Sequence, residues 1–123
     1  MKKKRVVKAL LINPEKETIT EIELEYGDKM LQELYRVIGC DSVEAMRSSL
    51  LMDGRLKSDD VWIDDEGLLK EQKHFWSLPY YSQWIAGNGV IMDTDEDGEC
   101  VGHTFTPTEI IKLEKQIFWR HAK

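Results

Sequence analysis

The stretch VVKALLINPEKETITEIELE, residues 6–25, decides the fold prediction because it joins an apolar run, a turn and an alternating segment. The apolar run ends at Asn13, where a proline-containing turn follows. Beyond the turn, Ile19, Ile22 and Leu24 alternate with Thr and Glu, although not in strict period two, which leaves a bulge as one option. We predict a β-hairpin with one face exposed to solvent.

A helix is predicted directly after this hairpin. Asp28 is a suitable N-cap, and Gly39 is a suitable end because glycine accepts the left-handed conformation found beyond helix C-termini. Between them, apolar side chains recur at the i, i+3, i+4, i+7 spacing that marks one buried helix face. These side chains are Leu31, Leu34, Tyr35 and Ile38.

Short strands and a second helix are predicted in the rest of the chain. Thr106, Pro107 and Glu109 form a helix start with a capping box, and we expect this helix to cover residues 107–121. The other predicted elements are strands over 43–51 and 61–63, an irregular segment over 74–89, and a hairpin of strands 90–94 and 99–102. In the first of these, Ala45, Met46 and Arg47 also permit a helix.

This order of elements indicates the α+β class. We expect a mostly antiparallel sheet of hairpins with two helices packed on it, both on one face. The 123 residues predict a single domain over 1–123.

Composition restricts the class of protein. Hydrophobic residues make up 41% and charged residues 33%, which is typical of a globular chain, and no apolar run is long enough to span a bilayer. The basic N-terminus leads into too short an apolar run for a signal peptide. We therefore expect a cytoplasmic protein in which Cys40 and Cys100 are free thiols.

Charge is distributed unevenly along the chain. Residues 53–99 hold twelve acidic and four basic side chains, whereas residues 1–52 hold nine of each. An acidic surface repels the nucleic-acid backbone and attracts basic proteins, although it can also serve solubility alone. The net charge of −6 thus favours a basic protein partner over direct nucleic-acid binding.

The segment VIMDTDEDGECVGHT, residues 90–104, resembles the start of a calcium-binding loop. Asp93, Asp95 and Asp97 alternate and Gly98 follows, but the twelfth position is Thr104, which cannot supply two carboxylate oxygens. Strand-like flanks favour an acidic hairpin turn instead. Cys100 and His103 have half of a zinc-site spacing without a second pair nearby, so we predict neither a metal site nor a cofactor.

Two sets of side chains are candidates for function. Carboxylates around two short strands could hold Mg²⁺ for phosphodiester cleavage if those strands are neighbours. Solvated turns are the preferred interpretation, because turn chemistry alone places acidic residues there. An aromatic segment could anchor a protein interface or plug the core. The carboxylates are Asp59, Asp60, Asp64, Asp65, Glu66, Asp93 and Asp95, and the aromatic candidates are Trp76, Tyr80, Tyr81 and Trp84.

Several segments together resemble the family catalogued as domain of unknown function 3846. They are KALLINPEKETITEIEL, LQELYRVIGCDSVEAMR, VWIDDEGLLK and IAGNGVIMDTDEDGE, and the likeness covers residues 7–99. The loop at 53–60 and the helix at 107–121 look like local additions. The resemblance implies small proteins of phages, plasmids and integrated elements, and it implies no catalytic residue.

These observations lead to two functional hypotheses. The first is a non-enzymatic inhibitor, of anti-CRISPR or anti-restriction type, that binds a basic host defence protein such as an RNA-guided nuclease or a restriction enzyme. Its predicted contacts are Trp76, Tyr80, Tyr81, Trp84, Asp64, Asp65, Glu66, Asp93, Asp95 and Asp97. The alternative is a metal-dependent nuclease that uses the clustered carboxylates. The sequence leaves the oligomeric state open.

Overall fold

A computed structural model describes residues 6–46, 51–52 and 55–122. Part of the predicted 43–51 strand, residues 47–50, lies outside the described residues. The elements are β1 (Val6–Asn13), β2 (Thr18–Glu25), α1 (Met30–Ile38), β3 (Val43–Met46), β4 (Leu51–Met52), β5 (Arg55–Leu56), β6 (Asp60–Asp64), the 3-10 turn η1 (Gly67–Leu69), β7 (His74–Ser77), β8 (Ile85–Ala86), β9 (Gly89–Thr94), β10 (Cys100–Val101), α2 (Pro107–Gln116) and β11 (Phe118–His121).

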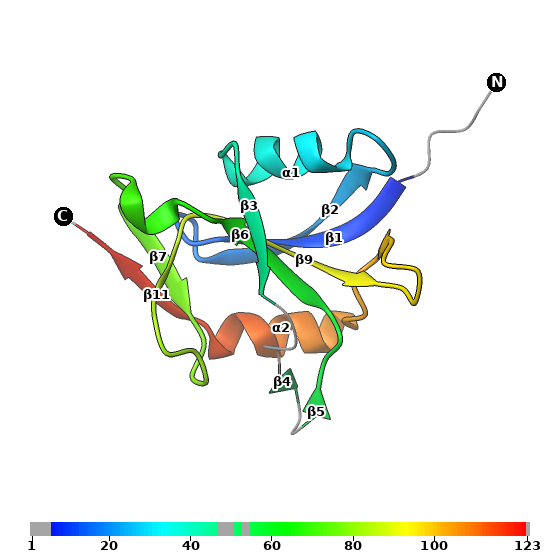
Figure 1. Cartoon of the computed structure of the whole chain (residues 1–123). Helices are drawn as coiled ribbons and strands as arrows, with labels where there is room; N and C mark the ends of the chain where they lie inside the picture. Colours follow the sequence, from blue (N-terminus) through cyan, green and yellow to red (C-terminus); the bar gives the residue numbers. More distant parts are fainter. Residues whose placement is uncertain (1–5, 47–50, 53–54, 123) are drawn as a thin grey trace.

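The main sheet has the strand order β2-β1-β9-β6-β3, and β10 pairs with β9 (Figure 1). All of its pairings are antiparallel. A second sheet has the order β11-β7-β8, and β4 pairs with β5. This arrangement confirms the predicted α+β class with a mostly antiparallel sheet.

The predicted first hairpin is confirmed, but it contains no bulge. β1 and β2 pair one to one from Val6 opposite Glu25 to Asn13 opposite Thr18. Ile19 faces one side of the sheet, while Ile22 and Leu24 face the other. The apolar positions depart from period two because both faces of the sheet are covered.

The two helices lie on opposite faces of the main sheet, as Figure 1 shows, and not on one face as we expected. α1 packs Leu34 and Ile38 on the face that holds Ala9, whereas α2 packs Leu113 on the face that holds Leu10. The reason is visible in β1 and β9, where consecutive residues are buried. Strands of this kind need cover on both sides.

The ends of both helices differ from the predictions. α1 begins at Met30, and its N-cap is Lys29 with no side-chain hydrogen bond, so Asp28 does not cap it. The predicted end is confirmed, because Gly39 has a φ of 82° and donates its N–H to the Tyr35 carbonyl. Leu31, predicted on the buried face, is 47% exposed.

α2 ends at Gln116 instead of continuing to residue 121. The next residues, Phe118–His121, extend as β11 and pair with β7. The segment predicted as irregular therefore contains strands β7 and β8. Pairing between distant segments overrides local helix preference here, as tertiary context commonly does.

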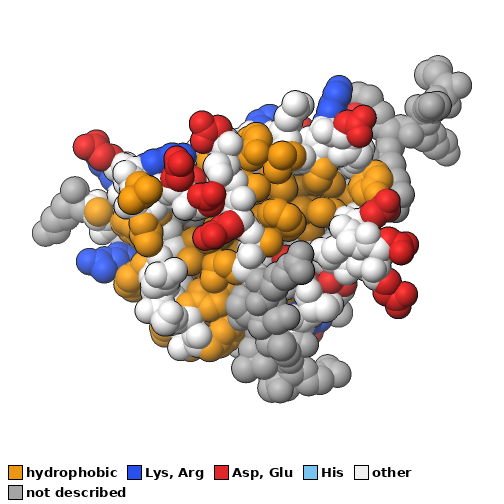
Figure 2. All heavy atoms as spheres, viewed as in Figure 1, with side chains coloured by type: hydrophobic (Ala, Val, Ile, Leu, Met, Phe, Trp, Pro, Cys, Tyr) orange, Lys and Arg blue, Asp and Glu red, His pale blue; other side chains and the backbone are white. Residues whose placement is uncertain are grey.

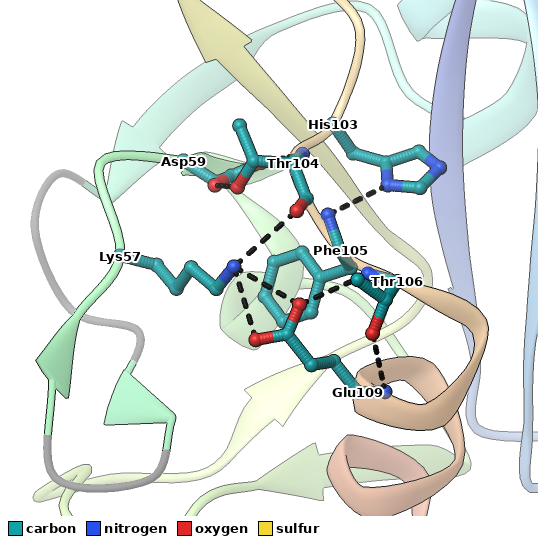
Figure 3. Close-up of polar contacts among 7 residues, drawn as sticks. All are labelled: Lys57, Asp59, His103, Thr104, Phe105, Thr106 and Glu109. Carbon is teal, nitrogen blue, oxygen red and sulfur yellow. Dashed lines mark hydrogen bonds and ion pairs between the residues drawn. The ribbon is translucent and has the colours of Figure 1, made fainter.

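The start of α2 is fixed by a dense group of polar contacts (Figure 3). Thr106 and Glu109 form the predicted capping box. The Lys57 ammonium lies 3.2 Å from a Glu109 carboxylate oxygen and 4.8 Å from the centre of the Phe105 ring. Asp59, fully buried, accepts hydrogen bonds from the backbone N–H and the hydroxyl of Thr104. These contacts hold the chain before β6 against the N-terminus of α2.

Candidate functional site

Trp76 is a core residue and not a surface anchor. Its side chain is completely buried, its indole N–H donates to the Gly87 carbonyl at 3.0 Å, and its ring lies over Gly89. A Cβ on Gly89 would lie 2.9 Å from a ring carbon of Trp76, so glycine is required for this approach. The predicted contact role of Trp76 is therefore wrong.

The other aromatic candidates reach the surface to different extents. Tyr80 is 39% exposed, whereas Tyr81 is half-buried against the core and contacts Tyr80 edge to face. Trp84 is also half-buried, and the Arg120 guanidinium carbon lies 5.7 Å from the centre of its ring. Arg120 comes from β11, so sequence reasoning had no signal that would pair it with Trp84.

The turn that follows β6 carries three of the predicted carboxylates in three different environments. Asp64 is buried and accepts hydrogen bonds from the Lys70 ammonium at 2.7 Å and the Glu66 N–H at 2.9 Å. The bond to Asp64 raises the pKa of Lys70. Asp65 is exposed and accepts from the Ser42 hydroxyl, and Glu66 is exposed. The charge of Asp64 is thus paired within the chain, whereas the side chains of Asp65 and Glu66 are exposed to solvent.

A shallow groove, named the β3 groove, places this turn beside the aromatic segment. It consists of two adjoining clefts of about 80 and 170 Å³ that share Gln83 and Ile85. Three carboxylates and Trp84 line the first cleft, and Tyr80 and Tyr81 line the second. The residues that define the groove are Glu44, Met46, Asp64, Asp65, Leu68, Leu69, Tyr80, Tyr81, Trp84 and Ile85.

Exposed apolar side chains border the β3 groove. Leu68 is 60% exposed and Leu69 is 86% exposed. Figure 2 shows hydrophobic side chains across this side of the molecule, with carboxylates at both ends of it. Sequence reasoning missed Glu44 and Met46, although their alternation on a strand could have placed both on one face.

The hairpin over residues 93–99, named the acidic hairpin, is the predicted turn. The Asp95 carboxylate accepts the N–H groups of Asp97 and Glu99 at 2.9 and 3.0 Å, and Gly98 has a φ of 81°. Asp93 is half-buried, with one oxygen that has no hydrogen-bond partner among the described residues. The side chains of Asp95, Glu96, Asp97 and Glu99 are exposed.

The turn of Asp64, Asp65 and Glu66, named the Asp64 turn, and the acidic hairpin lie at opposite ends of the β6–β9 strand pair. β6 and β9 are antiparallel neighbours, with Asp60 opposite Met92 and Ile63 opposite Gly89. The register offsets Asp64 and Asp93 by five residues along the strands, which at about 3.3 Å per residue separates them by about 17 Å. The strands are neighbours, as the magnesium hypothesis requires, but the Asp64 turn and the acidic hairpin are too far apart for their carboxylates to bind one ion.

Several of the candidate metal ligands are engaged in other bonds. Asp59 binds Thr104, and Asp60 accepts from the Thr94 hydroxyl at 3.2 Å. His103 lies 2.7 Å from a Glu21 oxygen and accepts from the Phe105 N–H, and the bond to His103 lowers the pKa of Glu21. Within the described parts of the chain, no three His, Cys, Asp or Glu side chains are grouped to hold a metal ion.

Both cysteines are free, as predicted. Cys40 and Cys100 are half-buried, and burial raises the pKa of each thiol. Neither is therefore set up as a reactive thiolate. No helix in the described residues is long and apolar enough to cross a membrane.

The fold and these surfaces define a small α+β protein with an acidic, partly apolar face. The chain belongs to the family described as domain of unknown function (DUF3846), whose model matches residues 7–116. The match extends through α2, so the expectation that this helix is a local addition is wrong. The matched range also encloses the 53–60 loop. No curated protein and no solved structure matches the chain significantly.

Proposed function

We propose that this protein is a non-enzymatic inhibitor from a mobile element. It acts in the cytoplasm by binding a basic, nucleic-acid-handling host defence protein of the CRISPR or restriction type. The acidic hairpin occupies the surface that the defence protein uses for phosphate groups.

The observation that carries this proposal is the state of the carboxylates on the acidic hairpin. Asp95, Glu96, Asp97 and Glu99 are all exposed, and no ion pair joins them to a Lys or Arg among the residues that the structure describes. The two N–H bonds to Asp95 hold the turn in one conformation. A fixed group of unpaired charges attracts an oppositely charged surface and loses little entropy on binding.

The β3 groove provides the apolar part of the same interface. A standard protein interface buries about 800 Å² on each partner, which corresponds to a patch about 30 Å across. The acidic hairpin and the Asp64 turn, about 17 Å apart by strand spacing, fit within one such patch. Tyr80 and Trp84 are the aromatic anchors, with Asp65 and Glu66 at the rim. No observation specifically favours the nuclease alternative, which stays a prediction.

The test is a pull-down from bacterial lysates that express candidate defence systems, with and without RNase. We expect a stoichiometric defence protein that remains bound after RNase treatment. The E96K/D97K variant should weaken this binding and reduce its dependence on salt. Dissolved salt screens the attraction between exposed charges, so removing the charges also removes the part of the binding that salt affects. Bound RNA without a protein, or RNA shortened in the presence of Mg²⁺, would overturn the proposal.

A matched control separates a local effect from net charge. The E15K/E23K variant changes the net charge by the same four units at exposed positions on β2 and the β1–β2 turn. We expect it to bind like the unmodified chain. Equal loss in both variants would show that only the overall charge matters and would contradict a role for the acidic hairpin.

A further inference from the structure

Two histidines that are far apart in the sequence meet side by side at the edge of the second sheet. His74 on β7 lies directly opposite His121 on β11. The next pair, Lys73 and Ala122, is joined by a hydrogen bond from the Ala122 N–H to the Lys73 carbonyl at 2.7 Å. Paired residues alternate in an antiparallel ladder, so the two histidines form a non-hydrogen-bonded pair, the kind whose side chains approach most closely.

The two imidazole rings face each other through the same ring nitrogen. The Nδ1 atoms lie 2.9 Å apart, and the rings are inclined by 72°. Only one of these nitrogens can carry a hydrogen in this contact, so the other offers a lone pair. The pair lies at the surface, where solvent and small ions reach it, since His121 is exposed and His74 is half-buried.

A carboxylate orients one of the two rings. The Nε2 atom of His121 lies 2.9 Å from an oxygen of Glu17, in the turn between β1 and β2. With its Nε2 hydrogen donated to Glu17, a neutral His121 directs the lone pair of Nδ1 toward His74. A carboxylate on the outer nitrogen of a histidine is the usual support of a metal-binding imidazole, because it fixes the tautomer and raises the basicity of the ligand.

We infer that His74 and His121 form a binding site for a divalent transition-metal ion, with both Nδ1 atoms as ligands and Glu17 as the residue that positions His121. Metal–imidazole bonds of about 2.0–2.1 Å place two ligand nitrogens about 3.3 Å apart in a tetrahedral site and about 2.9 Å apart in neighbouring square-planar positions. Turning each lone pair by about 35–45° away from the line between the two nitrogens brings both onto one ion. The hydrogen between the rings moves to the outer nitrogen of His74, and water fills the remaining positions.

The ligand set selects the kind of ion. Imidazole nitrogens suit Zn²⁺, Ni²⁺ and Cu²⁺, whereas Mg²⁺ and Ca²⁺ prefer oxygen ligands. The ion would tie β11 to β7 next to Arg120, whose guanidinium lies over Trp84. Metal binding thereby stabilises β11 in its pairing with β7, beside the aromatic segment. This inference does not depend on the function proposed above.

The test uses the full chain without a histidine tag, titrated with Zn²⁺ or Ni²⁺ and followed by calorimetry and by ¹⁵N NMR of the histidine rings. We expect one saturable site, with ligation at the Nδ1 atoms of two histidines and a raised unfolding temperature. H74Q and H121Q should each abolish the site, and E17Q should weaken affinity by about tenfold or more. Mg²⁺ at the same concentration should not bind.

The third histidine serves as the control. His103 bonds to Glu21 and Phe105 and lies in a different part of the fold, so H103Q should leave binding unchanged. Binding that survives both H74Q and H121Q, ligation through Nε2, or no response to Zn²⁺, Ni²⁺ or Cu²⁺ at millimolar concentration would overturn the inference. Circular dichroism of each variant shows that a lost site does not reflect a lost fold.

Discussion

The buried carboxylate of Asp59 accepts two hydrogen bonds from a single residue, Thr104, which lies 45 positions later in the chain. One comes from the backbone N–H and the other from the hydroxyl. The two residues join the start of β6 to the N-terminus of α2. A helix start that is tied down in this way depends on the carboxylate, which leads to the first prediction.

Replacement of Asp59 by alanine should destabilise the fold strongly. The change leaves the N–H and the hydroxyl of Thr104 without their acceptor in a buried site, which costs about 2–4 kcal/mol for bonds to a charged group. Urea unfolding measures this loss. D97A, at an exposed position of the acidic hairpin, should change the free energy of unfolding by less than about 0.5 kcal/mol. Equal effects of the two variants would contradict the role given to Asp59.

Acidification should remove the contribution of Glu109. The backbone N–H of Thr106 and the Lys57 ammonium hold the pKa of Glu109 below its ordinary value of 4.5. A depressed folded-state pKa stabilises the fold above pH 4.5, and this stabilisation is lost as the pH falls through the lower value. The difference in unfolding free energy between the unmodified chain and E109Q should therefore shrink from pH 7 to pH 3. A free-energy difference that does not change with pH would contradict the contribution assigned to the Glu109 carboxylate.

An alanine at Gly89 should clash with Trp76. The added Cβ would meet the ring carbon at 2.9 Å, and overpacking of this kind costs about 1–3 kcal/mol. The smaller ring of W76F removes that carbon, so G89A should cost less in the W76F background. A double-mutant cycle on the free energy of unfolding measures this coupling. Additive effects would show that the close approach is not what requires glycine.

Loss of Lys70 should leave Asp64 as a buried charge without its partner. The Asp64 side chain is 3% exposed and the Lys70 side chain is 35% exposed, so solvent screens the pair in part. We expect K70M to lower the free energy of unfolding, and D64N/K70M to recover most of that loss. Thermal unfolding at neutral pH provides the measurement. An unchanged K70M would show that Asp64 does not need this pair.

The difference between Asp64 and Asp65 shows why candidate site residues could be selected from the sequence but not ranked. Turn chemistry predicted both carboxylates, yet one is buried against Lys70 and the other is exposed. The two tryptophans differ in the same way, because Trp76 is buried in the core and Trp84 lines the β3 groove. Burial depends on which distant segment packs over a side chain, and local sequence does not contain that information.

Local chemistry alone determined the elements whose signals lie within a few residues. The first hairpin, the Gly39 stop of α1, the capping box of α2 and the acidic turn at Gly98 are of this kind, because each depends on backbone conformation or on contacts over short sequence separations. Tertiary structure alone decided the face that each helix covers, the conversion of Phe118–His121 into β11, and the meeting of His74 with His121. All three features depend on pairing or packing between segments that are tens of residues apart in the sequence. The free energy gained by burying both faces of the sheet outweighs the secondary-structure preference of any single segment.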